Sequence, residues 1–256
     1  AALATVISQI IGFFILYLKK KKNENIRVSL KQFKPNGKIY LTIFKNGLPS
    51  LSRQGIGTIA NIAMNFACAP YGDAVIAGMS VYNRVIFIGM AVVIGYGQGY
   101  QPVCSFNHGA KKYDRVYQGY KFLAIITTII ITALSVIGYI FAPELVAIFR
   151  KDSDVIKAGV QALRYQSFAM VVTGFCTASN MLMQSLRISG KATILALARQ
   201  GIFYIPAILL LPRIFGQTGI ALAQPVADIL SFVLTIFLVK PTVSKLRKMS
   251  IKKDVD

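Results

Sequence analysis

The segment VYQGYKFLAIITTIIITALSVIGYIFA, residues Val116–Ala142, is apolar over almost its whole length and carries one charged residue, Lys121. An α-helix needs about 20 predominantly apolar residues to cross about 30 Å of hydrocarbon. Six further stretches have comparable length and composition: Ala1–Leu18, Gly47–Pro70, Ala74–Phe106, Lys157–Leu186, Lys191–Leu211 and Gly216–Val239. The sequence therefore predicts an all-α polytopic integral membrane protein.

The overall composition supports this prediction. Apolar residues make up 55% of the 256 residues, and the mean hydropathy is +0.57. Both values exceed what the core of a water-soluble protein of this size requires. The lipid bilayer is therefore the expected surrounding of the chain.

The net charge of +20 could indicate a nucleic-acid partner, so its distribution along the chain matters. When the connector Lys19–Lys45 is placed in the cytosol, 21 of the 29 basic residues fall on the cytosolic side of the membrane and four on the other side. This asymmetry follows the positive-inside rule. The charge therefore predicts a membrane topology with a cytosolic C-terminus, and no nucleic-acid partner.

The residue types that carry catalysis are sparse. Cys68, Cys104 and Cys176 lie singly in three different apolar stretches, without the paired spacing of a metal or redox motif. The only histidine, His108, cannot form a metal site or a Ser/His/Asp triad by itself. We expect no catalytic residue, no metal site and no enzymatic activity.

The spacing of the apolar stretches predicts four regions. Residues 1–18 form a first helix, 19–46 a basic cytosolic linker that lies partly on the membrane surface as an amphipathic helix, 47–239 a six-helix lobe, and 240–256 a basic cytosolic tail. The chain begins inside a hydrophobic helix without an initiating Met. We therefore expect it to be the C-terminal part of a longer protein.

Three of the predicted spans carry a polar face at helical spacing. Such groups are unfavourable against lipid, so the faces predict a water-accessible cavity between helices. The alternative is that the faces hydrogen-bond to one another and hold the bundle together. The faces are Gln54, Thr58, Asn61 and Asn65; Thr173, Thr177, Asn180 and Gln184; and Gln224, Asp228, Ser231 and Thr235.

Asp228 is the only acidic residue near the middle of a predicted span. A carboxylate at that depth predicts a proton or Na⁺ site, or a partner for a cationic substrate. The alternative is a fixed ion pair with one of the four arginines inside spans. Two of these, Arg53 and Arg199, lie close enough to a helix end to reach the membrane interface. The four arginines are Arg53, Arg84, Arg164 and Arg199.

Several local strings are similar to those of one transporter family. They are Ala2–Gln9 (ALATVISQ), Gly47–Pro49, Gly99–Pro102 (GYQP), Asn107–Val116 (NHGAKKYDRV), Phe149–Asp152 (FRKD) and Ala223–Asp228 (AQPVAD). With these strings the chain resembles the C-terminal half of bacterial multidrug and toxic compound extrusion (MATE) transporters. The resemblance covers almost the whole sequence.

The resemblance implies a protein of twelve helices in two six-helix lobes, to which this chain supplies the sixth helix, the interlobe linker and the second lobe. It implies alternating-access export of small organic, often cationic compounds across the bacterial inner (cytoplasmic) membrane, driven by Na⁺ or H⁺ and without a cofactor. A first lobe of the same protein is the expected partner. The candidate residues of the substrate path are Gln54, Asn61, Asn65, Tyr82, Asn180 and Gln184, with Asp228 as the candidate ion-coupling residue.

The sequence departs from the family pattern at the acidic residues that several members carry in the seventh and tenth helices. The corresponding stretches, Gly47–Pro70 and Lys157–Leu186, contain none. The coupling ion therefore stays unassigned. Two further alternatives are a lipid-linked oligosaccharide flippase of the same superfamily and an inactive or scaffolding transporter fragment. The candidate ligands of the flippase for pyrophosphate are Arg53, Arg84, Arg164 and Arg199, of which Arg84 is the first to test. A seven-helix receptor also fits the number of spans.

Overall fold

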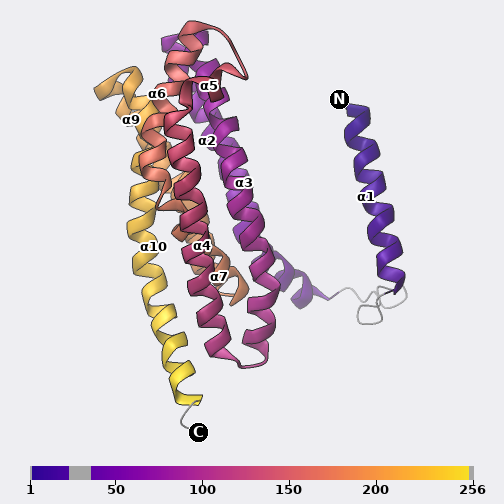
Figure 1. Cartoon of the computed structure of the whole chain (residues 1–256). Helices are drawn as coiled ribbons and strands as arrows, with labels where there is room; N and C mark the ends of the chain where they lie inside the picture. The colour runs from indigo at the N-terminus through magenta and orange to yellow at the C-terminus, as the bar shows by residue number, and fades with distance from the viewer. Residues whose placement is uncertain (1, 23–35, 254–256) are drawn as a thin grey trace. The chain divides into compact units, whose positions relative to one another are not determined.

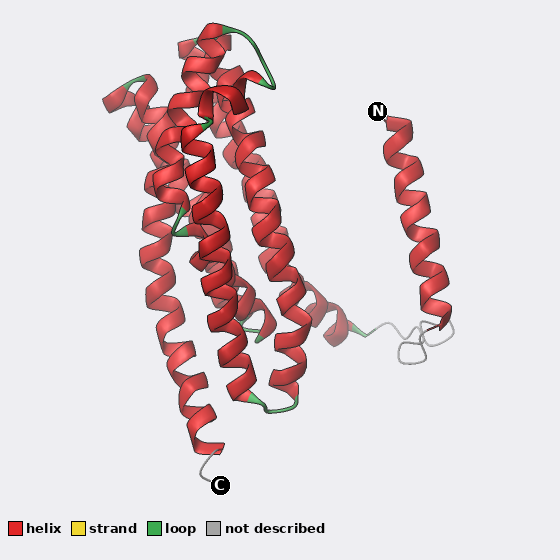
Figure 2. Ribbon diagram, in the orientation of Figure 1, coloured by secondary structure: helices red, strands yellow, loops and turns green. Residues whose placement is uncertain are grey.

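A computed structural model of the chain describes residues 2–22 and 36–253, and these residues form helices joined by short turns, without a strand among them (Figures 1 and 2). The prediction of an all-α fold is confirmed. The elements are α1 (Ala2–Lys22), α2 (Gly37–Cys68), the 3₁₀ turn η2 (Ala69–Tyr71), α3 (Asp73–Gly109), α4 (Tyr113–Ile140), α5 (Ala142–Ala147), α6 (Ser153–Met170), α7 (Thr173–Ser185), α8 (Ser189–Leu197), the π-helix η3 (Ala198–Phe203), α9 (Tyr204–Phe215) and α10 (Gln217–Lys253).

The chain divides into two compact units, Ala1–Thr42 and Ile43–Asp256. The first unit contains α1, in which Val6–Ile15 forms a short apolar segment. The second unit contains most of α2 and all later elements. The helices that build the candidate site all belong to the second unit.

Both ends of the predicted linker 19–46 are helical in the structure. Helix α1 continues to Lys22 and α2 begins at Gly37. Helix α2 begins directly after Pro35 and Asn36, and Oδ1 of Asn36 accepts a hydrogen bond from the backbone N–H of Lys38 at 3.0 Å, as a helix N-cap does. The rest of the predicted amphipathic surface helix, residues 23–35, lies outside the described residues. The predicted tail is also helical as far as Lys253, because α10 runs through Pro241.

The predicted span Lys157–Leu186 consists of two helices. Helix α6 ends at Met170 and α7 begins at Thr173. The Thr173 hydroxyl donates to the carbonyl of Met170 at 2.7 Å, which competes with the backbone hydrogen bonds that would continue the helix. By length and composition, four helical segments of the described chain can cross a membrane: Asp73–Gly109, Tyr113–Ile140, Ser189–Phe215 and Gln217–Met249.

Helices α3, α4, α6 and α10 lie side by side in the second unit (Figure 1). Small residues allow α3 and α6 to approach closely. A Cβ atom on Gly78 would lie 2.9 Å from the Cβ of Ala158 and 2.9 Å from the carbonyl oxygen of Val155. Where α4 meets α7, a Cβ on Gly174 would lie 2.8 Å from the carbonyl oxygen of Thr127. The bundle therefore depends on glycine at these two crossings.

The outer surface of the bundle is apolar along whole helix faces. On α4, Ile125, Ile129, Val136 and Ile140 recur at helical spacing and are about half exposed or more. Such a continuous exposed apolar face is unfavourable in water and is typical of a lipid-facing helix. The arrangement supports the prediction of a multi-pass membrane protein.

Candidate functional site

A cavity of about 370 Å³ lies within the second unit between α2, α3, α7, α8, η3 and α10. Its wall combines apolar side chains with amides and hydroxyls, and it holds one basic and one acidic residue. The polar members are Gln54, Asn61, Tyr82, Asn83, Thr173, Thr177, Asn180, Arg199, Gln200, Gln224, Asp228, Ser231 and Thr235. The cavity is therefore amphipathic and large enough for a small organic molecule.

The three predicted polar faces contribute unequally to this cavity. All four residues of the α10 face line it, together with Thr173, Thr177 and Asn180 of α7 and with Gln54 and Asn61 of α2. The cavity that the spacing predicted between these helices is thus present. The three polar faces point toward the cavity because the opposite, apolar side of each helix packs against other helices or lies on the outer surface.

The alternative interpretation, in which the three faces hydrogen-bond to one another, has no support among the hydrogen bonds of the described residues, since none of these joins one face to another. The hydroxyls of Thr177 and Thr235 donate to carbonyls one turn earlier in their own helices, at 2.8 and 2.7 Å. The amide of Asn180 donates from Nδ2 to the carbonyl of Ala192 at 2.9 Å and ties α7 to α8. The same residues therefore line the cavity and stabilise its walls.

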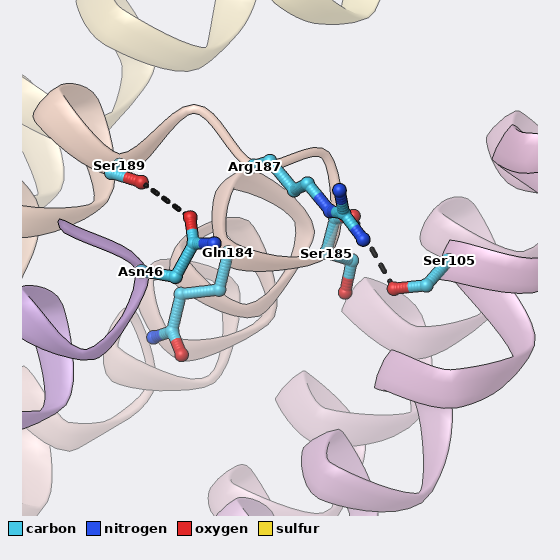
Figure 3. A pocket seen from close by; sticks show the side chains of 6 residues that line it. All are labelled: Asn46, Ser105, Gln184, Ser185, Arg187 and Ser189. Carbon is cyan, nitrogen blue, oxygen red and sulfur yellow. Dashed lines mark hydrogen bonds between the residues drawn. The ribbon is translucent and has the colours of Figure 1, made fainter. Parts of the chain in front are cut away.

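Two of the predicted path residues lie elsewhere. Gln184 lines a smaller cavity of about 200 Å³, together with Asn46, Ser105, Ser185, Arg187 and Ser189. There, Ser189 donates to Asn46 at 3.4 Å (Figure 3). Gln184 still contacts the main cavity indirectly, because its Nε2 donates to Oδ1 of Asn180. Asn65 is exposed and lines neither cavity.

Asp228 lies at the inner wall of the main cavity, and its side chain is fully buried. Arg199 donates to it twice, from Nε to Oδ1 at 2.6 Å and from Nη2 to Oδ2 at 3.3 Å. Gln166 donates from Nε2 to Oδ2 at 2.6 Å, and Gln224 from Nε2 to Oδ1 at 3.0 Å. The ion-pair alternative is therefore realised, with Arg199 as the partner.

The expectation that Arg199 reaches the membrane interface is wrong. Arg199 lies in the π-helix η3, which connects α8 with α9. A π-helix shifts the register of the following side chains and occurs frequently at functional sites. The Cβ of an alanine at Gly201 would lie 2.8 Å from Ile56, so η3 packs closely against α2. In this setting the guanidinium of Arg199 turns inward to the carboxylate of Asp228.

Two of the other arginines that the sequence places inside spans, Arg84 and Arg164, do not line the main cavity. Arg84, the first candidate ligand of the flippase alternative, is exposed and absent from the cavity wall. Arg164 is exposed, and its guanidinium carbon lies 5.6 Å from the centre of the Tyr139 ring. The side chain of Arg53 lies outside the described part of the structure. Arg199 is therefore the one basic residue among the described residues that line the main cavity.

The sequence analysis missed Gln166, which is fully buried beside Asp228. The sequence spacing could have identified it. Gln166 lies seven residues before Thr173 and so continues the predicted polar face of Thr173, Thr177 and Asn180. Tyr82, which was predicted, is buried and contributes to the wall of the cavity from α3.

Comparison with known proteins adds to this geometry. The MatE family model matches residues 49–210. Two curated relatives are named multidrug export protein MepA: that of Staphylococcus haemolyticus is 25% identical over 93% of this chain and 53% of its own length. That of Staphylococcus saprophyticus is 26% identical over 89% of this chain and 50% of its own length. The chain therefore spans about half the length of the curated relatives it matches.

Solved structures agree with the fold. A crystal structure of MATE in complex with MaL6 superposes with a TM-score of 0.86 at 21% identity, over 96% of this chain and 57% of that one. This likeness concerns the fold alone. Because the MatE family model covers more than half of the 256 residues, we conclude that the chain belongs to the MATE family of transporters.

Proposed function

We propose that this chain forms the second lobe of a multidrug exporter, which moves small organic compounds outward across the bacterial inner membrane in exchange for Na⁺ or H⁺. The observation that carries the proposal is the amphipathic cavity of about 370 Å³ in the second unit. Its volume lies in the range of small-molecule sites, and its wall mixes apolar side chains with a few polar groups. The relatives named multidrug export proteins support the same activity.

The proposed substrate path runs along Gln54, Asn61, Tyr82 and Asn180, which line the cavity from three helices. Gln184 and Asn65, the other two residues expected on the path, lie outside this cavity, so the proposed path does not include them. The proposed partner is a first lobe of the same protein, since a two-lobe transporter opens its central cleft between lobes. No cofactor besides the coupling ion is proposed.

The proposed topology has a cytosolic C-terminus. The turn between α3 and α4 and the C-terminal end of α10 lie at the same end of the bundle (Figure 1). Both segments are basic: Lys111, Lys112 and Arg115 follow α3 or begin α4, and Lys245, Arg247 and Lys248 lie near the end of α10. Clustering of basic residues at one end supports a cytosolic location for that end.

The proposed coupling ion is either Na⁺ or H⁺, and the proposal does not distinguish between the two. Asp228 is the candidate coupling residue on this chain, and its carboxylate is neutralised by Arg199 in the described conformation. A cation could bind at Asp228 only in a state in which Arg199 has moved away. The flippase alternative is not favoured, because Arg84 and Arg164 lie outside the cavity and Arg199, which lines it, is already paired with Asp228.

The test is ethidium efflux from cells that express the full reading frame, beside cells that express only these 256 residues. The Na⁺ and proton gradients are collapsed in turn. Efflux that depends on a gradient and requires the full frame supports a cation-coupled exporter with this chain as its second lobe. No efflux from either strain contradicts the proposal and favours the inactive-fragment alternative.

A further inference from the structure

Of the described residues that line the main cavity, two are charged, and they differ in what they offer to a ligand. The side chain of Asp228 is 0% exposed, whereas that of Arg199 is 23% exposed. The pair is neutral as a whole, but its accessible end is the guanidinium. A molecule in the cavity therefore meets a positive charge and hydrogen-bond donors.

The carboxylate of Asp228 has no remaining capacity to bind a ligand. Its two oxygens offer about four lone-pair positions. Oδ1 accepts from Arg199 and Gln224, and Oδ2 accepts from Gln166 and again from Arg199. A cationic group in the cavity would have to displace one of these donors to reach the carboxylate.

Arg199, by contrast, keeps free donors. A guanidinium has five N–H groups, and only Nε and Nη2 donate in the hydrogen bonds between described residues. Its planar fork matches a carboxylate, and its charge persists at every physiological pH. Asp228 already holds the guanidinium of Arg199 in place through Nε and Nη2. Little side-chain entropy is therefore lost when a ligand binds the remaining N–H groups.

The remaining wall of the cavity is suited to an apolar body. Ile86, Phe87 and Met90 line it from α3, and Leu195 and Ala196 from α8. A flat or aliphatic group can bury apolar surface there, at about 25 cal/mol per Å². The arrangement thus combines one oriented cationic donor with an extended apolar surface.

We infer that this cavity binds organic anions through an anionic oxygen, such as a carboxylate, at the free edge of Arg199, with the apolar body of the ligand along α3. The inference rests on the proposed function, since it treats the cavity as a substrate site. It assigns to this lobe a substrate class opposite in charge to the organic cations that the resemblance implies.

Cys176 provides a direct report of occupancy. It lines the same cavity and is partly exposed, whereas Cys68 and Cys104 are fully buried, at 0% and 1% exposure. The full-length protein in detergent is treated with N-ethylmaleimide, with a Cys176→Ser variant to identify the Cys176 signal. The added probes are 2-naphthoate and 2-naphthylmethylammonium, which share an apolar ring and differ in charge.

We expect 2-naphthoate to slow the labelling of Cys176 at a roughly tenfold lower concentration than the ammonium compound does. Equal protection by both probes, better protection by the ammonium compound, or no protection by 2-naphthoate would overturn the inference. This experiment uses the unsubstituted protein, so its outcome does not depend on whether a variant folds.

A second measurement assigns the effect to Arg199. Cys176 is modified by two methanethiosulfonate reagents, one carrying a sulfonate and one a trimethylammonium group. Both react with the same thiolate, so the ratio of their rates cancels its protonation state. In the neutral double variant Arg199→Gln/Asp228→Asn we expect the sulfonate-to-ammonium ratio to fall roughly tenfold. An unchanged ratio would contradict the inference, and Arg164→Gln serves as the control that leaves it unchanged.

The two proposals fail separately. Gradient-dependent ethidium efflux without protection by 2-naphthoate would support the exporter and contradict the anion-binding site at Arg199. Protection by 2-naphthoate without efflux would keep the site and remove the exporter activity.

Discussion

Gln166 donates through Nε2 to Oδ2 of Asp228 at 2.6 Å, while its own Oε1 is buried and has no hydrogen-bond partner among the described residues. Leaving a buried carbonyl oxygen unpaired is unfavourable by itself. The donation to a carboxylate offsets that cost, because hydrogen bonds to charged acceptors are stronger than neutral ones. Gln166 is thus oriented by the charge of Asp228.

This relationship predicts the effect of changing Gln166. In Gln166→Leu, Asp228 loses one of its donors, and we expect a loss of about 1–3 kcal/mol in the free energy of unfolding. Gln166→Glu should be more harmful, since it places a second carboxylate beside the first. The measurement is thermal unfolding of the full-length protein in detergent, followed by circular dichroism.

Gln161→Leu is the matched control on the same helix, because Gln161 is half-buried and donates to the Thr218 hydroxyl at 3.3 Å. An equal loss in Gln161→Leu and Gln166→Leu would show that the charge of Asp228 does not matter.

The Arg199 and Asp228 pair predicts non-additive effects. Asp228→Asn or Arg199→Gln alone leaves the other charge uncompensated in the protein interior, at a cost of about 3 kcal/mol. The double variant Arg199→Gln/Asp228→Asn should lose less stability than the sum of the two single variants, because both charges are absent. Unfolding measurements on the four proteins give the coupling energy. Strictly additive losses would mean that the pair is not coupled.

Asn61 and Asn65 form a matched pair for testing the cavity. Both are exposed asparagines on α2, but only Asn61 lines the main cavity. Asn61→Leu should change ethidium efflux by roughly tenfold, equivalent to about 1.4 kcal/mol of binding energy. Asn65→Leu should leave efflux within about twofold of the unsubstituted protein. Equal effects in both variants would place the substrate path elsewhere on α2.

Close packing at Gly174 predicts a steric effect. In Gly174→Ala the new Cβ would lie 2.8 Å from the carbonyl oxygen of Thr127, which is backbone and cannot rotate away. We expect a loss of about 1–3 kcal/mol in stability. Gly95→Ala is the control, since a Cβ at Gly95 meets no atom within 4 Å and alanine favours the helix. Comparable thermal midpoints for both variants would show that α7 can shift away from α4.

Much of the site followed from local pattern. The spacing of Gln224, Asp228, Ser231 and Thr235 placed four side chains on one face of a helix, and all four line the cavity. Only two residues of the α2 face, Gln54 and Asn61, line the cavity, whereas Thr58 and Asn65 have the right spacing but do not. Helical spacing gives the direction of a side chain around the axis, but not how far along the axis the neighbouring helices stay in contact.

Other features depended on interactions that local pattern does not contain. Gln166 continues the polar face of α7, but the helix breaks between Met170 and Thr173. At this break the Thr173 hydroxyl donates to the carbonyl of Met170. Arg199 was expected at the interface, because its distance from a helix end was counted on an α-helix. The π-helix η3 instead turns it toward Asp228.

The sequence by itself determined the class of the protein, most of its helices and the direction of the polar faces, because hydrophobic length, helical period and charge asymmetry are properties of neighbouring residues. The tertiary structure alone decided which of four arginines neutralises Asp228 and which side of that pair faces the cavity. The physical reason is that the partner of a buried charge depends on the rotation and packing of helices far apart in the chain, and on the hydrogen bonds that enclose it.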